Sequence, residues 1–315
     1  MSRIHDALKR AEQERQSQPG SGVVTAEVSN PTTPLDVLDS SPELAQAYIP
    51  QEQPGDSVLA PLPRELTLEA LNSNGARREW APDPKKMVFS GDDHENYSAI
   101  EEFRTLRSRL YQMREKRNFK IILVSSALPA EGKTFVSANL AHVLARHRSK
   151  TVLLIDADLR KPALHHCLGA ASVPGLSEYL RAEQDEQSII QRGQHDNLFF
   201  IPCGGPTPNP GELISNGRLQ SLLAQVNQVF DWVIVDSPPA VPVSDASRIA
   251  SWCDGVLLVV QSGSTPFDMA QRARRDFRTA PLLGVVLNRV APGSTYTSYY
   301  YYNRSEKPTD VSKDT

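Results

Sequence analysis

The stretch Ala127-Leu-Pro-Ala-Glu-Gly-Lys-Thr134 joins an apolar run at residues 120–125, which predicts a strand, to a helical pattern at residues 135–148. It follows the phosphate-binding pattern G-x-x-x-x-G-K-S/T, with Ala127 in place of the first glycine. Gly132 would let the backbone approach a phosphate, and the start of the helix would point N–H groups at it. The alternative is a chance Gly-Lys-Thr turn, which two further motifs argue against. The stretch predicts a nucleotide site in which Lys133 neutralises the β- and γ-phosphates and Thr134 ligates Mg²⁺.

Apolar runs and helical patterns alternate along the middle of the chain. Most of the apolar runs are continuous, as in strands buried on both faces of a parallel sheet; they cover residues 120–125, 151–156, 198–202, 232–236, 255–261 and 284–288. Helical patterns cover residues 97–113, 135–148, 218–229, 244–250 and 266–279. This alternation predicts an α/β fold with a doubly wound, mostly parallel sheet.

Aspartates follow two of the predicted strands. Asp236 ends the run Trp232-Val-Ile-Val-Asp236, while Asp156 and Asp158 leave the run at residues 151–156 two positions apart. In extended backbone such a pair points the same way. One carboxylate can hold a metal and a second can accept the proton of an incoming hydroxyl. Strand-end caps or turn formers are the alternative, and the set of three predicts carboxylates around a metal–nucleotide site.

Composition excludes several classes of protein. The 315-residue chain has a formal net charge of −3, which gives no electrostatic footprint for nucleic acid. Its three cysteines, Cys167, Cys203 and Cys253, are far apart and odd in number, so reduced cytosolic thiols are expected rather than disulfides or zinc. No apolar run approaches the roughly 20 residues that span a bilayer, and the first residues lack a signal peptide's apolar stretch. We expect a cytoplasmic protein that reaches the inner membrane through a partner.

Four zones differ in composition. Residues 1–15 have apolar side chains at helical spacing among basic ones, which predicts an amphipathic helix. Residues 16–85 hold ten of the 24 prolines, and we expect a disordered linker there. Residues 86–290 form the predicted α/β domain. Residues 291–315 form a polar tail that is expected to be flexible.

The tail contains five tyrosines within seven residues, Tyr296, Tyr299, Tyr300, Tyr301 and Tyr302. Small and hydroxylated neighbours favour a segment able to enter an active site. An edge strand or an aromatic patch is the alternative, but an exposed patch of this kind would be a liability without a purpose. These tyrosines are predicted phosphoacceptors, and each phosphate would add about −1.5 to −2 charges.

The chain resembles the bacterial tyrosine kinases, or BY-kinases, that control capsule and exopolysaccharide assembly. The resemblance rests on Pro129-Ala-Glu-Gly-Lys-Thr134, Leu153-Leu-Ile-Asp-Ala-Asp-Leu-Arg160 and Asp231-Trp-Val-Ile-Val-Asp236, which look like that family's Walker A, Walker A′ and Walker B motifs. The segments Gly175-Leu-Ser-Glu-Tyr-Leu180 and Asn209-Pro-Gly-Glu-Leu-Ile214 and the tyrosine tail also match. The resemblance covers roughly residues 97–302 and implies a P-loop NTPase fold of the partition and division-site ATPase type.

The resemblance implies roles for matching residues. ATP and Mg²⁺ are the expected cofactors, with Lys133, Asp156, Asp158 and Asp236 as catalytic residues and Asp156 as the candidate base. Metal ligands would be Thr134, Asp158 and Asp236. Nucleotide would contact Ala130, Glu131, Gly132, Lys133, Thr134, Phe135, Asn288 and Arg289, and Arg160 could contact phosphate or the acceptor.

The segment Glu101-Glu-Phe-Arg-Thr-Leu-Arg107 has the form E-x-x-R-x-x-R, which resembles the family's subunit-interface motif. The three-residue step puts Glu101, Arg104 and Arg107 along one side of a helix. A salt-bridged solvent face is the alternative. With the kinase motifs present, we expect this face to bind a neighbouring copy, giving a homo-oligomer that phosphorylates itself in trans.

The implied activity is an ATP-dependent tyrosine autokinase switched by a separate membrane polysaccharide co-polymerase, or chain-length determinant protein, and reversed by a cognate tyrosine phosphatase. Residues 1–15 are either a docking peptide for that system or a simple capping helix. One rival is a P-loop ATPase switch that hydrolyses ATP with water. Such ATPases commonly place a second lysine early in the loop, and residues 125–131 contain none. The other rival is a scaffold whose nucleotide site regulates assembly.

Overall fold

A seven-stranded sheet forms the centre of the molecule, with strand order β3-β4-β2-β5-β1-β6-β7. All neighbouring strands are parallel except β3 and β4, which are antiparallel. The strands are β1 (Ile121–Ser126), β2 (Val152–Asp156), β3 (Gln191–Arg192), β4 (Leu198–Ile201), β5 (Trp232–Asp236), β6 (Gly255–Gln261) and β7 (Leu282–Asn288). The predicted α/β class with a doubly wound, mostly parallel sheet is confirmed.

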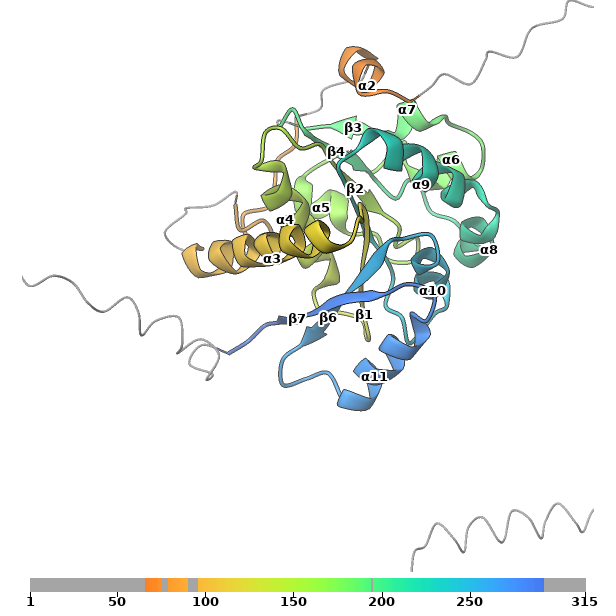
Figure 1. Ribbon diagram of the computed structural model, residues 1–315. Helices are drawn as coiled ribbons and strands as arrows, with labels where there is room; N and C mark the ends of the chain where they lie inside the picture. The colour runs from red at the N-terminus through yellow and green to blue at the C-terminus, as the bar shows by residue number, and fades with distance from the viewer. Residues whose placement is uncertain (1–65, 75–78, 90–95, 194, 292–315) are drawn as a thin grey trace, which may run out of the picture. The chain divides into compact units, whose positions relative to one another are not determined.

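The computed structural model describes residues 66–74, 79–89, 96–193 and 195–291 (Figure 1). The predicted helix at residues 1–15, most of the predicted linker and the tyrosines of the tail lie outside these residues. Within the described ranges, no helix combines the length and the apolar character needed to cross a membrane.

Helices cover both faces of the sheet, as the ribbon shows (Figure 1). Alternate residues of β1 point to opposite faces: Ile121 and Leu123 pack in one core cluster, and Ile122 and Val124 pack in the other. The helices are α2 (Leu68–Asn74), α3 (Tyr97–Lys116), α4 (Lys133–Ala145), α5 (Leu164–Leu168), α6 (Leu176–Leu180), α7 (Glu186–Ile189), α8 (Pro210–Ser215), α9 (Arg218–Val229), α10 (Asp245–Ala250) and α11 (Phe267–Asp276). Side chains of α3 and α4 join the second cluster, and those of α9 and α10 join the first.

Parts of the predicted linker are packed, so the expectation for residues 16–85 is wrong at the described residues 66–74 and 79–85. Leu71 on α2 is 2% exposed and Trp80 is 5% exposed. The Trp80 ring meets Phe200 of β4 edge to face, with 6.0 Å between the ring centroids. The proline count led to the expectation of a linker, but burying these large side chains outweighs the entropy lost in ordering the segment.

His142 on α4 is a buried, neutral histidine. Its ring stacks on Phe89 with centroids 5.0 Å apart and meets the edge of His195 at 4.9 Å. Burial, followed by the charges of His195 and Arg146, lowers the pKa of His142 from 6.5 to about 3. The unfolded chain therefore takes up this proton at a higher pH than the folded chain. The stability that neutral His142 contributes is present above about pH 6.5 and is lost as the pH falls toward 3.

We expect His142→Phe to flatten the acid dependence of stability. Between about pH 6.5 and pH 3, the wild-type free energy of unfolding should fall by up to about 1.4 kcal/mol per pH unit more than that of the variant. Urea unfolding at a series of pH values measures both slopes. His147→Phe, which changes an exposed histidine just beyond the end of α4, should keep the wild-type slope. Equal slopes for wild type and His142→Phe would contradict the burial argument.

Candidate active site

The loop between β1 and α4 curves around the end of the sheet without needing a glycine at its first position. Ala127 is fully buried, and its carbonyl accepts a hydrogen bond of 3.2 Å from the Val241 N–H. Positive φ values occur instead at Ala130 (65°) and at Gly132 (96°). Since the described residues with positive φ do not include Ala127, alanine is accommodated there.

Glu131 and Asn288 hold this loop in place. The Glu131 carboxylate accepts the Leu128 N–H at 2.7 Å and the hydroxyl of Thr265, which precedes α11. The Asn288 side chain, at the end of β7, donates to the Glu131 carbonyl at 2.9 Å. Asn288 packs so close to Gly132 that a Cβ there would lie 2.1 Å from its Nδ2. The loop is therefore shaped by contacts from β7 and from the segment after β6.

Lys133 and Thr134, the first residues of α4, lie against the carboxylates at the ends of β2 and β5. Lys133 Nζ is 2.8 Å from Asp158 Oδ2 and 3.8 Å from Asp236 Oδ2. The Thr134 hydroxyl donates to Asp236 Oδ2 at 2.8 Å, and the Ser137 hydroxyl donates to Asp236 Oδ1 at 2.9 Å. The structure thus brings together the predicted lysine, threonine and two of the predicted aspartates.

Burial and charge act against each other in this cluster. Burial lowers the pKa of Lys133, but Asp236 and then Asp158 outweigh it and hold that pKa above its ordinary value. Burial raises the pKa of Asp236, although Lys133 and the Thr134 hydroxyl oppose the rise. Burial also raises the pKa of Asp156, and the neighbouring Asp236 carboxylate adds to the rise. A buried carboxyl with a raised pKa is suited to hold a proton near neutral pH.

Asp156 and Asp158 both lie near Lys133, but different groups bind them. Asp156 is the last residue of β2, lies opposite Asp236 of β5 in the register and is fully buried. Its Oδ2 accepts the N–H groups of Ala163 and Leu164 at 3.2 and 3.1 Å. Asp158 lies in the following loop and turns its Oδ2 to Lys133. The predicted pair therefore spans the end of β2, with Asp156 in the strand and Asp158 in the loop.

Two residues that the sequence analysis missed belong to this region. Ser137 lies one helical turn after Lys133 and binds Asp236, a position that the spacing of α4 could have indicated. Asp245 on α10 binds Arg160 through both carboxylate oxygens, at 2.7 Å from Nε and 3.3 Å from Nη2. Arg160 and Asp245 are 85 positions apart, so no local pattern could have paired them.

The oxygen donors fit a Mg²⁺ site of the kind that phosphates complete. A Thr134 hydroxyl and the Asp236 and Asp158 carboxylates converge beside Lys133. Over the described ranges, no three His, Cys, Asp or Glu side chains gather as a metal cage. Mg²⁺ commonly keeps several waters and uses one or two carboxylates together with substrate phosphates, so this donor set suffices.

The remaining predicted residues make contacts with other parts of the domain. The Phe135 ring packs on Phe103 of α3, with centroids 5.8 Å apart, so the ring belongs to the core. Arg289 donates to Gln261 Oε1 at 3.0 Å. On α3, Arg104 pairs with Glu101 of its own helix, and Arg107 donates to the Val143 carbonyl of α4 at 3.0 Å.

Gly132→Ala should destabilise the protein more than Gly263→Ala does. Both glycines have positive φ, 96° and 69°, where alanine costs about 1–2 kcal/mol. Only at Gly132 would the new Cβ meet another residue, Asn288, because nothing lies within 4 Å of the position at Gly263. Urea unfolding should show a larger loss for Gly132→Ala, and Asn288→Ala in the same chain should recover the excess. Equal losses at the two glycines would show that Asn288 does not pack on the loop.

Comparisons with known proteins agree with this geometry. Residues 130–312, more than half of the chain, match the CobQ/CobB/MinD/ParA nucleotide binding domain. Tyrosine-protein kinase YwqD of Bacillus subtilis (strain 168) is 34% identical over 208 residues, which are 65% of this chain and 87% of that protein. A Klebsiella pneumoniae protein named putative tyrosine-protein kinase in cps region is 34% identical over 247 residues, or 78% of this chain. The chain spans about a third, 34%, of that longer relative.

A solved structure, the kinase domain of Escherichia coli tyrosine kinase ETK, superimposes with a TM-score of 0.58 at 33% identity. The match covers 63% of this chain and 80% of the solved one. The matched nucleotide-binding domain contains the phosphate loop from Ala130 onward and all three aspartates. The relatives named as tyrosine-protein kinases therefore share the part of the chain that builds the site. On this evidence the chain belongs to the bacterial tyrosine kinase family, whose members are protein-tyrosine kinases with a P-loop NTPase fold.

Proposed function

We propose that this chain is an ATP-dependent protein-tyrosine autokinase. In this proposal it phosphorylates the tail tyrosines of neighbouring copies and thereby regulates capsular or exopolysaccharide polymerisation and export. The observation that carries the proposal is the contact of Lys133 with Asp158 and Asp236, beside the raised-pKa carboxyl of Asp156. A hydrolytic switch needs a metal carboxylate and a positioned water, whereas this site adds a second carboxyl that can receive a hydroxyl proton.

The nucleotide is held by the loop and by the ends of the strands. The Lys133 ammonium leaves Asp158 and binds the β- and γ-phosphates. The backbone N–H groups at the start of α4 point at the same phosphates. Thr134, Asp158 and Asp236 hold Mg²⁺, which neutralises charge on the phosphates when it is bound. Asn288 and Arg289 lie on the adenine side. Ala130, Glu131 and Phe135 contribute through their backbone.

The transfer step balances with the groups present. The phenolic oxygen of a tail tyrosine forms a bond to the γ-phosphorus while the bond from that phosphorus to the β–γ bridging oxygen breaks. ADP leaves with that electron pair. The ionised form of Asp156 takes the phenolic proton, and its raised pKa makes that form a stronger base than an ordinary carboxylate. The acceptors are Tyr296, Tyr299, Tyr300, Tyr301 and Tyr302.

Transfer between copies requires an interface, which we place on α3. Glu101 and Arg104 have side chains 44% and 40% exposed, so both are accessible to a second copy. Their ion pair within one helix is worth only about 0.3–0.5 kcal/mol, and a partner's charges can replace it at little cost. Phosphates added to several tail tyrosines would repel one another and release the copies.

The polysaccharide role is supported by the Klebsiella pneumoniae relative, whose name places it in a cps region. We propose a cytoplasmic kinase recruited to the inner membrane by a separate polysaccharide co-polymerase and reset by a tyrosine phosphatase. The segment at residues 1–15 and the linker after it would tether the kinase domain to this system.

A mixing experiment tests the proposal. One full-length copy carries all five tail tyrosines as phenylalanine, so it can transfer phosphate but not accept it at the tail. The other carries Lys133→Met and an intact tail, so it can accept but not transfer. Each copy is incubated with Mg·ATP by itself, and the two copies are also incubated together. Both arrangements are repeated with a fused cytoplasmic segment of a polysaccharide co-polymerase.

Phosphotyrosine should form only in the mixture, and peptide mapping should place it on the Lys133→Met copy. Steady ATP hydrolysis with no phosphotyrosine in the mixture or in wild type, even with the fused segment, would contradict the kinase proposal. An ATPase switch would then be the better account.

A further inference from the structure

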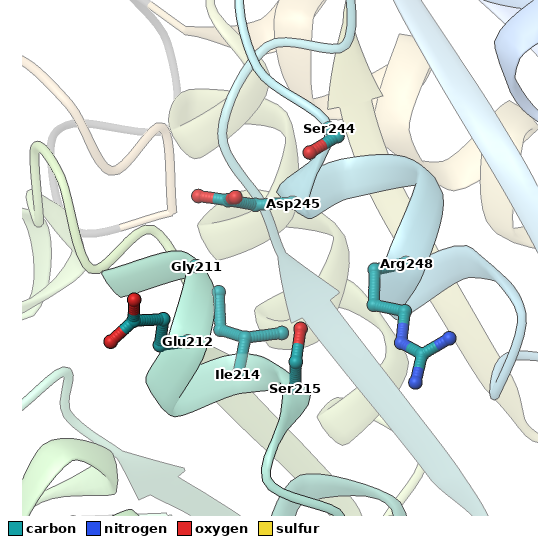
Figure 2. A pocket seen from close by; sticks show the side chains of 7 residues that line it. All are labelled: Gly211, Glu212, Ile214, Ser215, Ser244, Asp245 and Arg248. Carbon is teal, nitrogen blue, oxygen red and sulfur yellow. The ribbon is translucent and has the colours of Figure 1, made fainter. Parts of the chain in front are cut away.

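A pocket between α8 and α10 lies beside the site described above and shares Asp245 with it. It has a volume of about 310 Å³ and is shown in Figure 2, which places the α8 residues on one wall and the α10 residues on the other. The lining residues are Gly211, Glu212, Ile214, Ser215, Ser244, Asp245 and Arg248. Pockets for drug-sized ligands have volumes of about 300–1,000 Å³, so this pocket lies at the lower end of that range. It is therefore better suited to a single side chain than to a second nucleotide.

One ion pair separates this pocket from the reacting carboxylates. Asp245 on the pocket wall binds Arg160 at 2.7 Å, and the Arg160 N–H donates to Asp158 Oδ1 at 3.3 Å. Asp158 in turn contacts Lys133. The two helices follow β4 and β5, which flank β2 in the sheet, so the pocket lies at the same carboxyl edge as the phosphate loop.

The lining suits a neutral aromatic ring that carries a hydroxyl. Ile214 is 1% exposed and gives the lining an apolar side chain, while Glu212 and Asp245 give it carboxylates that can accept a phenolic hydrogen bond. Ser215 and Ser244 are exposed and supply hydroxyls from opposite walls. The guanidinium of Arg248 already lies over the Trp252 ring, with 5.2 Å from Cζ to the centroid, and a second ring could pack against its other side.

We propose that this pocket is an acceptor subsite. It holds one tail tyrosine of a second copy while a neighbouring tyrosine of the same tail lies at Asp156 and Asp158. The inference rests on the proposed copy-to-copy transfer and adds a specificity element to it. Five tyrosines in seven residues ensure that a second ring follows within a short span, since three extended residues reach only about 10 Å. The tyrosine run, rather than a lone tyrosine, is then the recognised substrate.

Two synthetic peptides of residues 293–305 test the subsite while keeping the number of acceptors equal. Both retain Tyr300 as their one tyrosine; the other four tyrosines are phenylalanine in one peptide and serine in the other. The kinase is the full chain with its own five tail tyrosines changed to serine, so that its tail neither accepts phosphate nor fills the pocket. We expect KM to be about tenfold lower for the phenylalanine-flanked peptide, because one more ring packs on Ile214 and on the Arg248 guanidinium.

Ser215→Trp and Ser244→Trp fill the pocket from opposite walls, so either variant keeps the test valid if the other fails to fold. Each should reduce the tenfold preference to about twofold or less. Ser221→Trp, at an exposed serine of α9 outside the pocket, should keep the preference. Equal KM values for the two peptides with the parent kinase, or an unchanged preference in a folded Ser215→Trp or Ser244→Trp chain, would overturn the subsite. Failure of the kinase to phosphorylate either peptide, together with an unphosphorylated tail in the wild-type chain, would instead contradict the proposed function.

Discussion

Lys133→Met is expected to abolish detectable tyrosine phosphorylation. In the structure the ammonium group lies 2.8 Å from Asp158 Oδ2 and 3.8 Å from Asp236 Oδ2, at the site proposed for the phosphates. Removing it takes away the charge that would stabilise the transferring phosphoryl group, a loss of about 10²- to 10³-fold in rate. Phosphotyrosine formed per minute from Mg·ATP, measured by intact-mass analysis, reports the effect.

The same change removes the partner of two buried carboxylates, so stability has to be followed as well. Breaking a buried ion pair costs about 3 kcal/mol or more, and urea unfolding of Lys133→Met measures the cost. Lys150→Met is the matched control, because Lys150 also pairs with an aspartate, Asp231, at 3.0 Å but at the opposite end of β2. That variant should retain the activity. Wild-type phosphorylation by a folded Lys133→Met chain would refute the role of the loop lysine.

Asp156→Asn is expected to slow phosphoryl transfer by about 10²- to 10⁴-fold, the range that a general base contributes. In wild type the rate should rise with pH, because burial and Asp236 raise the pKa of Asp156 and its base form appears only as the proton leaves. The variant, which has no carboxyl to titrate, should lack that rise. Single-turnover rates across the pH range where the folded chain is stable test both statements.

Asp158→Asn decides which carboxylate is the base. Asp158 contacts Lys133 directly, whereas Asp156 is bound by backbone N–H groups of the loop that enters α5. If Asp156 is the base and Asp158 a metal ligand, Asp158→Asn should raise the Mg²⁺ concentration needed for half-maximal rate but keep the rise of rate with pH. A flat pH profile in Asp158→Asn, together with an intact one in Asp156→Asn, would assign the base to Asp158.

Much of the fold could be predicted because its strands are continuous apolar runs bounded by helical patterns. The phosphate loop and Asp236 were predictable for the same reason, since their positions at the ends of strands bring them to one edge of the sheet. Short helices were not predictable: α8 has six residues, too few for a 3.6-residue period to show. The proline-rich composition concealed α2 and Trp80, whose burial depends on contacts with distant residues such as Phe200.

Several residues of the site were predictable from the sequence, but the contacts between them were not. The different contacts of Asp156 and Asp158 follow from the end of β2 at Asp156, a boundary that sequence patterns place only within a few residues. The Arg160–Asp245 pair and the Glu131–Thr265 contact join residues 85 and 134 positions apart, and so depend on the folded chain. The pocket between α8 and α10 likewise forms only when segments distant in the sequence pack together.

The most direct test of the central claim is intact-mass analysis of the purified full-length chain after incubation with Mg·ATP. Wild type would be compared with the chain in which the five tail tyrosines are phenylalanine, each with and without the fused co-polymerase segment. The account predicts phosphate additions in wild type, mapped to residues 296–302, and none in the phenylalanine chain. ATP consumption without any phosphate addition to the wild-type chain, or equal additions to both chains, would contradict it.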